Sequence, residues 1–360
     1  MRIHCIQIFL IILFASFTSC QTGKSKTVSV VWKNNKAVAI AIPLSYLKDS
    51  EDPTKHLAVQ LIKSEQPTNV LGEFTISNDQ VLFEPLVPLT RNLEYDILFH
   101  NESVATVAIP PSDAPAPELL SLYPTQDTIP ENLLKIYLRF SQPMEEGHSL
   151  SFVTVLKNDR DTMKGTFLDL QPELWSNDGT MLTLWLDPGR IKRELIPNLK
   201  LGAPLITDQH YTLLISGNWK SKEGILLKSS HRKEFITTLR DDQSPQIKQW
   251  TSIVPAVASI DPLTINFKES LDYGLLNDAV LITDERNTSI NGTITISNEE
   301  RTFQFVPETQ WKPGNYSITF ESRLEDLSGN NLDHPFDRDL KVNAEVGERN
   351  GVFKMSFTIR

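Results

Sequence analysis

One phrase occurs twice in the sequence, far apart along the chain. The first copy, residues 72–85, reads GEFTISNDQVLFEP, and the second, residues 292–307, reads GTITISNEERTFQFVP. In both copies, apolar and polar residues alternate on either side of a short polar segment, SND or SNEE. An alternation of period two predicts strands with one buried face, and Ser, Asn and Asp favour tight turns. Each copy is therefore predicted to be a β-hairpin.

The alternation also predicts which hairpin side chains face a core. These are Phe74, Ile76, Val81 and Phe83 in the first copy and Ile294, Ile296, Phe303 and Phe305 in the second. A looser copy occupies residues 165–188, and each copy is followed by a strand that contains a tyrosine, namely Tyr95, Tyr211 or Tyr316. The middle copy is longer, and its extra residues, 189–206, are predicted to be a surface loop, because loops tolerate insertion.

Two further motifs give the repeat a family resemblance. Residues 137–144 read YLRFSQPM and residues 325–332 read EDLSGNNL. With the hairpins, they resemble the bacterial Ig-like domain of the SbsA or S-layer type, and the first copy is the divergent member. The resemblance implies an all-β protein with three tandem Ig-like β-sandwiches at residues 27–110, 118–240 and 246–360. The proline-rich segment 110–117 is expected to be a stiff linker, and 240–245 a shorter hinge.

The N-terminus predicts export and an anchor. An apolar run from Ile8 to Phe17, too short to span a bilayer, leads to small residues and Cys20, and the only other cysteine is Cys5. The ending resembles the lipobox of Bacteroidota lipoproteins, which implies a signal peptide at residues 1–19, lipidation of Cys20 and a polar tether at 20–26. A plain signal peptide with a chance cysteine is the alternative. Because no acidic run follows Cys20, we expect the outer membrane, facing the periplasm, with surface exposure as the other option.

Composition and spacing argue against several function classes. The net charge is −10, and no long basic stripe exists to bind nucleic acid. The histidines have no metal-ligand spacing, and no nucleophile motif is present. We therefore expect no enzyme, no cofactor and no metal. Two weaker options stay open: an ion held by residues 325–331, and a hydrolase site in the 189–206 insertion.

A few residues are candidates for binding or modification. Trp219 lies in a predicted loop and could stack on a sugar, although packing inside the loop is the alternative. Thr128 and Thr162 lie in D-T-apolar triplets, which resemble the O-glycosylation pattern of Bacteroidota. The leading expectation is a non-enzymatic scaffold that binds the bilayer through acylated Cys20 and also binds an envelope protein or glycan. The alternative is an auxiliary carbohydrate-binding lipoprotein of a glycan-uptake system.

Overall fold

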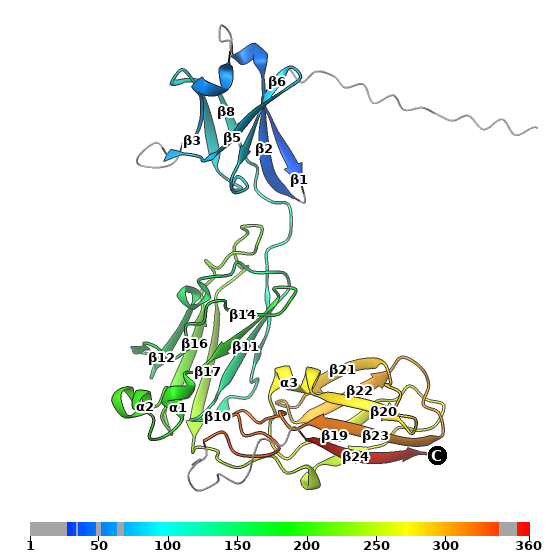
Figure 1. The fold of residues 1–360 in the computed structure, drawn as a ribbon. Coiled ribbons are helices and arrows are strands. Elements are labelled where there is room, and N and C mark those ends of the chain that lie inside the picture. Colours follow the sequence, from blue (N-terminus) through cyan, green and yellow to red (C-terminus); the bar gives the residue numbers. More distant parts are fainter. Residues whose placement is uncertain (1–26, 34, 48–51, 63–67, 338–350) are drawn as a thin grey trace, which may run out of the picture. The chain divides into compact units, whose positions relative to one another are not determined.

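The computed structural model describes residues 27–337 and 351–360, except 34, 48–51 and 63–67 (Figure 1). The chain forms two compact units, Met1–Ser112 and Asp113–Arg360. Antiparallel sheets dominate both units, as the alternating sequence predicts. Cys20, the predicted signal peptide and the predicted tether lie outside the described residues.

Unit 1 is one sandwich of two four-stranded sheets. The first sheet has the order β1-β2-β6-β5, with bounds Ser29–Lys33, Lys36–Pro43, Gln80–Pro85 and Gly72–Ser77. The second has the order β4-β3-β7-β8, with bounds Thr68–Asn69, Leu57–Leu61, Glu94–Phe99 and Glu102–Ala108. Inward side chains of both sheets, including Ile40, Phe83 and Ile97, are fully buried between them.

Unit 2 begins with what we call the middle sandwich. Its larger sheet has the order β10-β17-β16-β12-β13, with bounds Thr128–Pro130, His231–Thr238, His210–Ile215, Val153–Lys157 and Asp161–Met163. The facing sheet has the order β14-β15-β11-β9, with bounds Leu174–Trp175, Met181–Trp185, Lys135–Phe140 and Leu119–Tyr123. The core between them includes Leu138 and Tyr211.

Unit 2 ends with the last sandwich. One sheet has the order β18-β19-β22-β21, with bounds Thr251–Ile253, Leu263–Asn266, Thr302–Pro307 and Gly292–Ser297. The other has the order β20-β23-β24, with bounds Val280–Asp284, Gly314–Glu321 and Val352–Ile359. Helix α3, Tyr273–Asp278, precedes β20. Ile265, Phe303 and Phe320 lie in this separate core. Short 3-10 helices cover Leu44–Tyr46, Pro53–His56, Ser149–Phe152 and Ile247–Gln249.

The two predicted hairpins are confirmed. Strand β5 pairs with β6 from Gly72↔Pro85 to Ser77↔Gln80, and β21 pairs with β22 from Gly292↔Pro307 to Ser297↔Thr302. Each hairpin begins with glycine because a Cβ there would collide with an aromatic ring and a carbonyl oxygen of the partner strand. The looser middle copy is less regular: Phe167 makes one isolated bridge to Leu186, and β14 is short.

The predicted core positions are right for one strand of each hairpin and only partly right for the other. Val81, Phe83, Phe303 and Phe305 are buried. Phe74, Ile294 and Ile296 are partly buried against their cores. Ile76 is 53% exposed, so its prediction is wrong. Both β5 and β21 are edge strands, which have a neighbouring strand on one side only.

The insertion at residues 189–206 is folded, which corrects the expectation of a loop. It contains helices α1, Pro188–Ile191, and α2, Ile196–Leu201. Arg190 is only 6% exposed. Its guanidinium donates to the carbonyl oxygens of Gly165 at 2.6 Å, Gly202 at 2.9 Å and Ala203 at 3.1 Å. A buried arginine therefore ties both ends of the insertion to the middle sandwich.

Candidate functional site in unit 2

The two sandwiches of unit 2 meet through buried polar contacts. Lys135 on β11 forms ion pairs with Glu325 and, at 3.4 Å, with Asp272, both from the last sandwich. The Tyr137 hydroxyl donates to Asp272 Oδ1 at 2.7 Å. Asp272 also accepts from Leu275 N at 2.8 Å, so it caps α3 as well as binding the neighbouring sandwich. We call Lys135, Tyr137, Asp272 and Glu325 the paired cluster.

Electrostatics fix the protonation pattern of the paired cluster. Burial raises the pKa of Tyr137, and the charge of Asp272 raises it further, so its hydroxyl stays protonated and donates. Burial works to lower the pKa of Lys135, but Asp272 and Glu325 outweigh it and raise that pKa. For the acid Glu325 the effect of burial has the opposite sign: burial raises its pKa, and the positive charge of Lys135 opposes the rise. The cluster therefore holds a protonated lysine among buried acceptors.

Further contacts connect the two sandwiches beyond the paired cluster, and we call the whole contact region the joint. Glu300, 2% exposed, accepts from Thr125 Oγ1 at 2.7 Å and Thr125 N at 3.1 Å. Asn132, 2% exposed, donates to Asp241 O at 2.7 Å and accepts from Ser328 Oγ at 3.0 Å. Buried groups on both sides are therefore satisfied across the joint, as burial requires.

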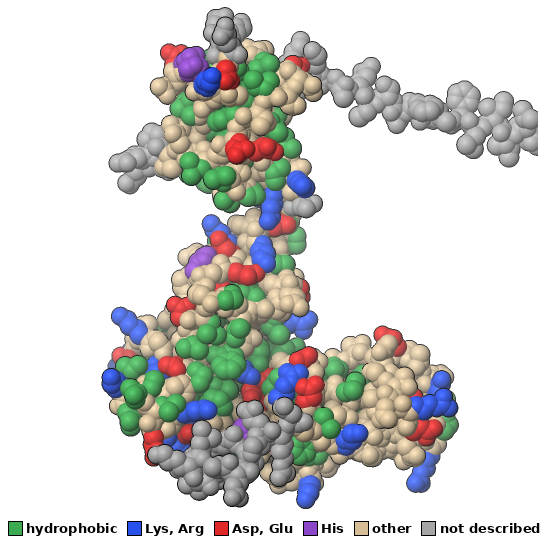
Figure 2. Space-filling view, in the orientation of Figure 1, with side chains coloured by type: hydrophobic (Ala, Val, Ile, Leu, Met, Phe, Trp, Pro, Cys, Tyr) green, Lys and Arg blue, Asp and Glu red, His purple; other side chains and the backbone are tan. Residues whose placement is uncertain are grey.

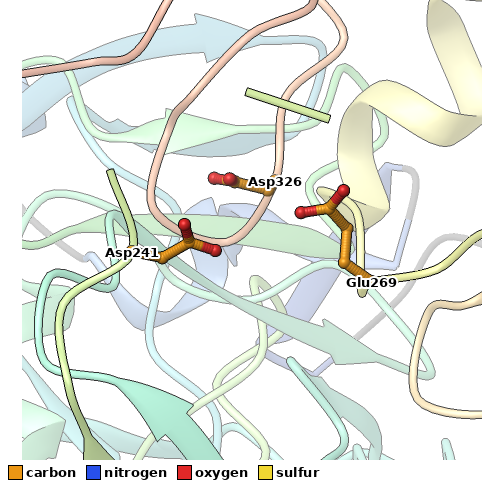
Figure 3. Close-up of side chains that lie close together, drawn as sticks. All are labelled: Asp241, Glu269 and Asp326. Atoms are coloured by element: carbon orange, nitrogen blue, oxygen red, sulfur yellow. The ribbon is translucent and has the colours of Figure 1, made fainter. Parts of the chain in front are cut away.

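A cavity of about 620 Å³ lies beside these contacts and is lined by both sandwiches. Asp241, Glu269 and Asp326 each place a carboxylate oxygen within 4.8 Å of the others (Figure 3). We call these residues the carboxylate triplet. Positive side chains also line the cavity, namely Arg240, Lys268 and Arg301.

The EDLSGNNL motif positions the buried member of the triplet. Asp326 accepts from Ser328 N at 2.7 Å, Asn330 N at 3.0 Å and Asn330 Nδ2 at 2.8 Å. Gly329 has a φ of +81°, and a Cβ there would press against Leu134 of the middle sandwich. Glycine is needed for both reasons. The motif thus makes a tight loop that fixes Asp326 against the neighbouring sandwich.

The triplet brings three carboxyl groups close together, and burial disfavours the charged forms of Glu269 and Asp326. Burial raises the pKa of Glu269 to about 7, and the charge of Asp241 adds to the rise. Burial also raises the pKa of Asp326 well above its ordinary value, although its hydrogen bonds oppose this. Close carboxylates disfavour joint ionisation, so they bind protons more tightly or take up a cation. Oxygen ligands suit Ca²⁺, which takes six to eight of them, so the triplet could supply part of such a shell.

The structure corrects the expectation for Trp219. This side chain is fully buried, packed between Phe140 and Phe152 with ring centroids at 5.2 and 5.3 Å. Its Nε1 donates to Glu145 O at 3.1 Å. The loop folds back through a bridge between Met144 and Ser221, so polar neighbours in the sequence do not expose the ring. Trp219 offers no face to a sugar.

The other candidates stay apart from the triplet or outside the description. Thr128 and Thr162 are exposed on β10 and β13, and their glycosylation stays a prediction. In the insertion, Arg190 binds carbonyls and Arg193 pairs with Asp242 and Asp337. These basic groups therefore have structural partners. Among the described residues, no helix is long and apolar enough to cross a bilayer.

Sequence reasoning named only part of the triplet. The segment 325–331 was an open option for an ion, and it contains Asp326. Asp241 and Glu269 were missed because they follow β17 and β19, strands of different sandwiches. The acidic character of the predicted hinge at 240–245 was the one available signal.

Comparisons with known proteins agree with this architecture. Residues 241–342 match the family model of the bacterial Ig-like domain. Among solved structures, the N-terminal part of the bacterial S-layer protein SbsC is 13% identical with a TM-score of 0.22, covering 68% of this chain and 44% of that one.

Two further solved structures are similar at the same level. A three-immunoglobulin-domain structure of titin is 11% identical with a TM-score of 0.19, covering 84% of this chain and 87% of that one. Three fibronectin domains of chicken CNTN1 are 8% identical with a TM-score of 0.20, covering 92% and 98%. A search of curated proteins found no match. Residues 241–342 are thus similar to the bacterial Ig-like domain, and the sheet pairings described above give a tandem Ig-like architecture of β-sandwiches.

Proposed function

We propose that this protein is a non-enzymatic, lipid-anchored scaffold of the cell envelope that holds a partner protein or glycan. The observation that carries the proposal is the joint of unit 2. There Lys135, Tyr137, Asp272 and Glu325 link two sandwiches through buried, charge-assisted contacts. A joint of this kind resists bending, and a rigid pair of sandwiches presents its loops to a partner in one fixed arrangement.

The described side chains support a binding role more than catalysis. His231 approaches Ser229 at 3.5 Å on the exposed surface, and no described carboxylate accompanies that pair. A nucleophile normally needs both a base and a group that orients the base. The bacterial Ig-like match agrees with a structural or binding module, although fold alone does not fix function.

The anchor is tested with the Cys20→Ala variant. We expect the native chain in the outer-membrane fraction and the variant in the soluble periplasmic fraction. Crosslinking in cells, followed by purification of each form, should recover an envelope protein or glycan with the native chain and much less of it with the variant. Unchanged fractionation would contradict the anchor. Turnover of an envelope polymer by the purified chain would contradict the scaffold.

A carbohydrate-binding role is the second candidate, at a different place from Trp219. Trp185 is partly exposed on the outer face of β15, and it lines a groove of about 330 Å³ with Met181 and Thr183. An indole face beside a hydroxyl suits a sugar ring. Titration with envelope glycans should show binding that Trp185→Ala abolishes. Equal binding by the variant would dismiss this groove.

A further inference from the structure

The insertion of the middle sandwich presents apolar side chains to solvent. The exposed fractions are 65% for Ile196, 71% for Leu199 and 68% for Leu201, with Leu195 at 44% and Ile206 at 47%. Ile196, Leu199 and Leu201 lie on the short helix α2, Leu195 directly precedes it, and Ile206 follows later in the insertion. Large apolar side chains that are this exposed and this close together mark an interaction site more often than chance.

We call these exposed apolar side chains the apolar tip. The insertion that carries them is tied to the rest of unit 2. Arg190 donates to three carbonyl oxygens, and Asn198 Nδ2 donates back to Arg190 O at 2.5 Å. Arg193 ties the same segment to Asp242 at 3.0 Å and Asp337 at 2.9 Å. Arg190, Asn198 and Arg193 thus fix the insertion to the rest of unit 2, while Leu199 and Leu201 stay exposed.

The residues of the insertion itself have a net positive charge, opposite in sign to that of the whole chain. Residues 189–206 contain four basic residues and one acidic residue, whereas the whole chain has a net charge of −10. Lys200 is exposed on α2 between Leu199 and Leu201. Lys192 lies nearby with its Nζ 4.3 Å from the centroid of the Phe336 ring. Figure 2 shows hydrophobic side chains together with basic and some acidic ones over this end of the middle sandwich.

We propose that this tip inserts into the headgroup region of a bilayer that carries anionic lipid. Apolar side chains that project outward, with lysines beside them, are stabilised at such an interface. Burial of the apolar groups and attraction of the lysines to anionic lipid both contribute. A protein partner would need a matching pocket for each leucine, whereas a fluid lipid surface adapts to a projecting tip. The inference deepens the proposed function, because it adds a second membrane contact to the one made by Cys20.

The test uses the chain from Gln21, which keeps every described residue and lacks the anchor. Binding is measured by flotation with vesicles of phosphatidylethanolamine and phosphatidylglycerol, and with vesicles of phosphatidylcholine alone. We expect binding to the anionic vesicles that weakens at high salt. The double variant Leu199→Ser/Leu201→Ser should reduce it at least about tenfold, and Lys200→Glu should reduce it less.

The matched control is Ile253→Ser, a 61% exposed isoleucine on β18. It should bind vesicles like the parent chain. No binding by the parent chain, or equal binding by the double leucine variant, would overturn the inference. Self-association that the leucine variant abolishes, without vesicle binding, would assign the tip to a second copy and also overturn it. Membrane fractionation of native chain and Cys20→Ala tests the anchor separately, so either proposal can fail alone.

Discussion

The paired cluster and the carboxylate triplet lie in the same joint between the two sandwiches of unit 2, but their buried acidic groups are accommodated in different ways. In the paired cluster, Asp272 and Glu325 share Lys135, and Asp272 also accepts from the Tyr137 hydroxyl. In the triplet, three carboxylates converge, and Arg240, which lines the same cavity, binds Asp242 and Asp337 instead. One half of the joint is therefore held by compensated charge. The other is held by Asn132, Asn330 and the tight loop around Asp326, although three carboxyl groups lie close together there.

Of the changes that test this comparison, removing Lys135 should have the largest effect on the stability of unit 2. Lys135→Met leaves Asp272 and Glu325 buried without their counter-ion, which costs about 3–5 kcal/mol in the free energy of unfolding. Urea unfolding followed by tryptophan fluorescence measures it, because unit 2 holds every tryptophan except Trp32. The control is Lys228→Met, which breaks an exposed pair with Glu118 and should cost about 1 kcal/mol or less. Equal costs would show that the paired cluster is no stronger than a surface pair.

Removing the tyrosine hydroxyl should have an intermediate effect. Tyr137→Phe deletes a hydrogen bond to the buried Asp272 carboxylate, and bonds to charged groups contribute about 1.5–3 kcal/mol. Tyr316→Phe is the matched variant, because its partly buried hydroxyl bonds to the neutral backbone of Lys312, donating to the carbonyl oxygen at 3.0 Å and accepting from the amide at 3.3 Å. It should cost about 0.5–1.5 kcal/mol. A larger cost at Tyr316 than at Tyr137 would contradict the charge-assisted character of the joint.

Removing a charge from the triplet should have the smallest effect and the opposite sign. The pKa of Glu269 is raised from 4.5 to about 7, so the folded chain binds this proton more tightly than the unfolded chain does. Stability contributed by that proton is present at low pH and is lost as pH rises from 4.5 to 7. Glu269→Gln should therefore stabilise unit 2 above pH 7 by about 1–2 kcal/mol, after allowing for solvent screening of a partly exposed group.

The measurement is the thermal midpoint from pH 5 to 8 for the parent chain and for Glu269→Gln. The two should agree at pH 5 and diverge as pH rises. Glu285→Gln, at an exposed position of the last sandwich, should keep the parent's pH dependence. A Glu269→Gln chain that is less stable than the parent at pH 8 would mean that this carboxylate forms a favourable contact there.

What the sequence predicts well is local. The hairpins at 72–85 and 292–307 follow from period two and from turn residues a few positions apart. The prediction that Trp219 is exposed is wrong because the polar residues beside it in the sequence do not reveal the bridge between Met144 and Ser221 that covers it. The triplet could not be predicted as a whole, because segments that are distant in the sequence meet only after both sandwiches of unit 2 pack together.

The loop that ends in Asn330 has a consequence for how this chain can be divided. Its groups bond to Asn132 and its glycine fits against Leu134, both in the middle sandwich. The segment similar to the bacterial Ig-like domain, 241–342, also stops before β24, which pairs along the whole of β23. The stretch recognisable as a module is therefore smaller than the stretch that folds together. A gene fusion or deletion made at its boundaries would remove the hydrogen-bond partners of the loop in the middle sandwich. It would also leave β23 without its neighbouring strand β24.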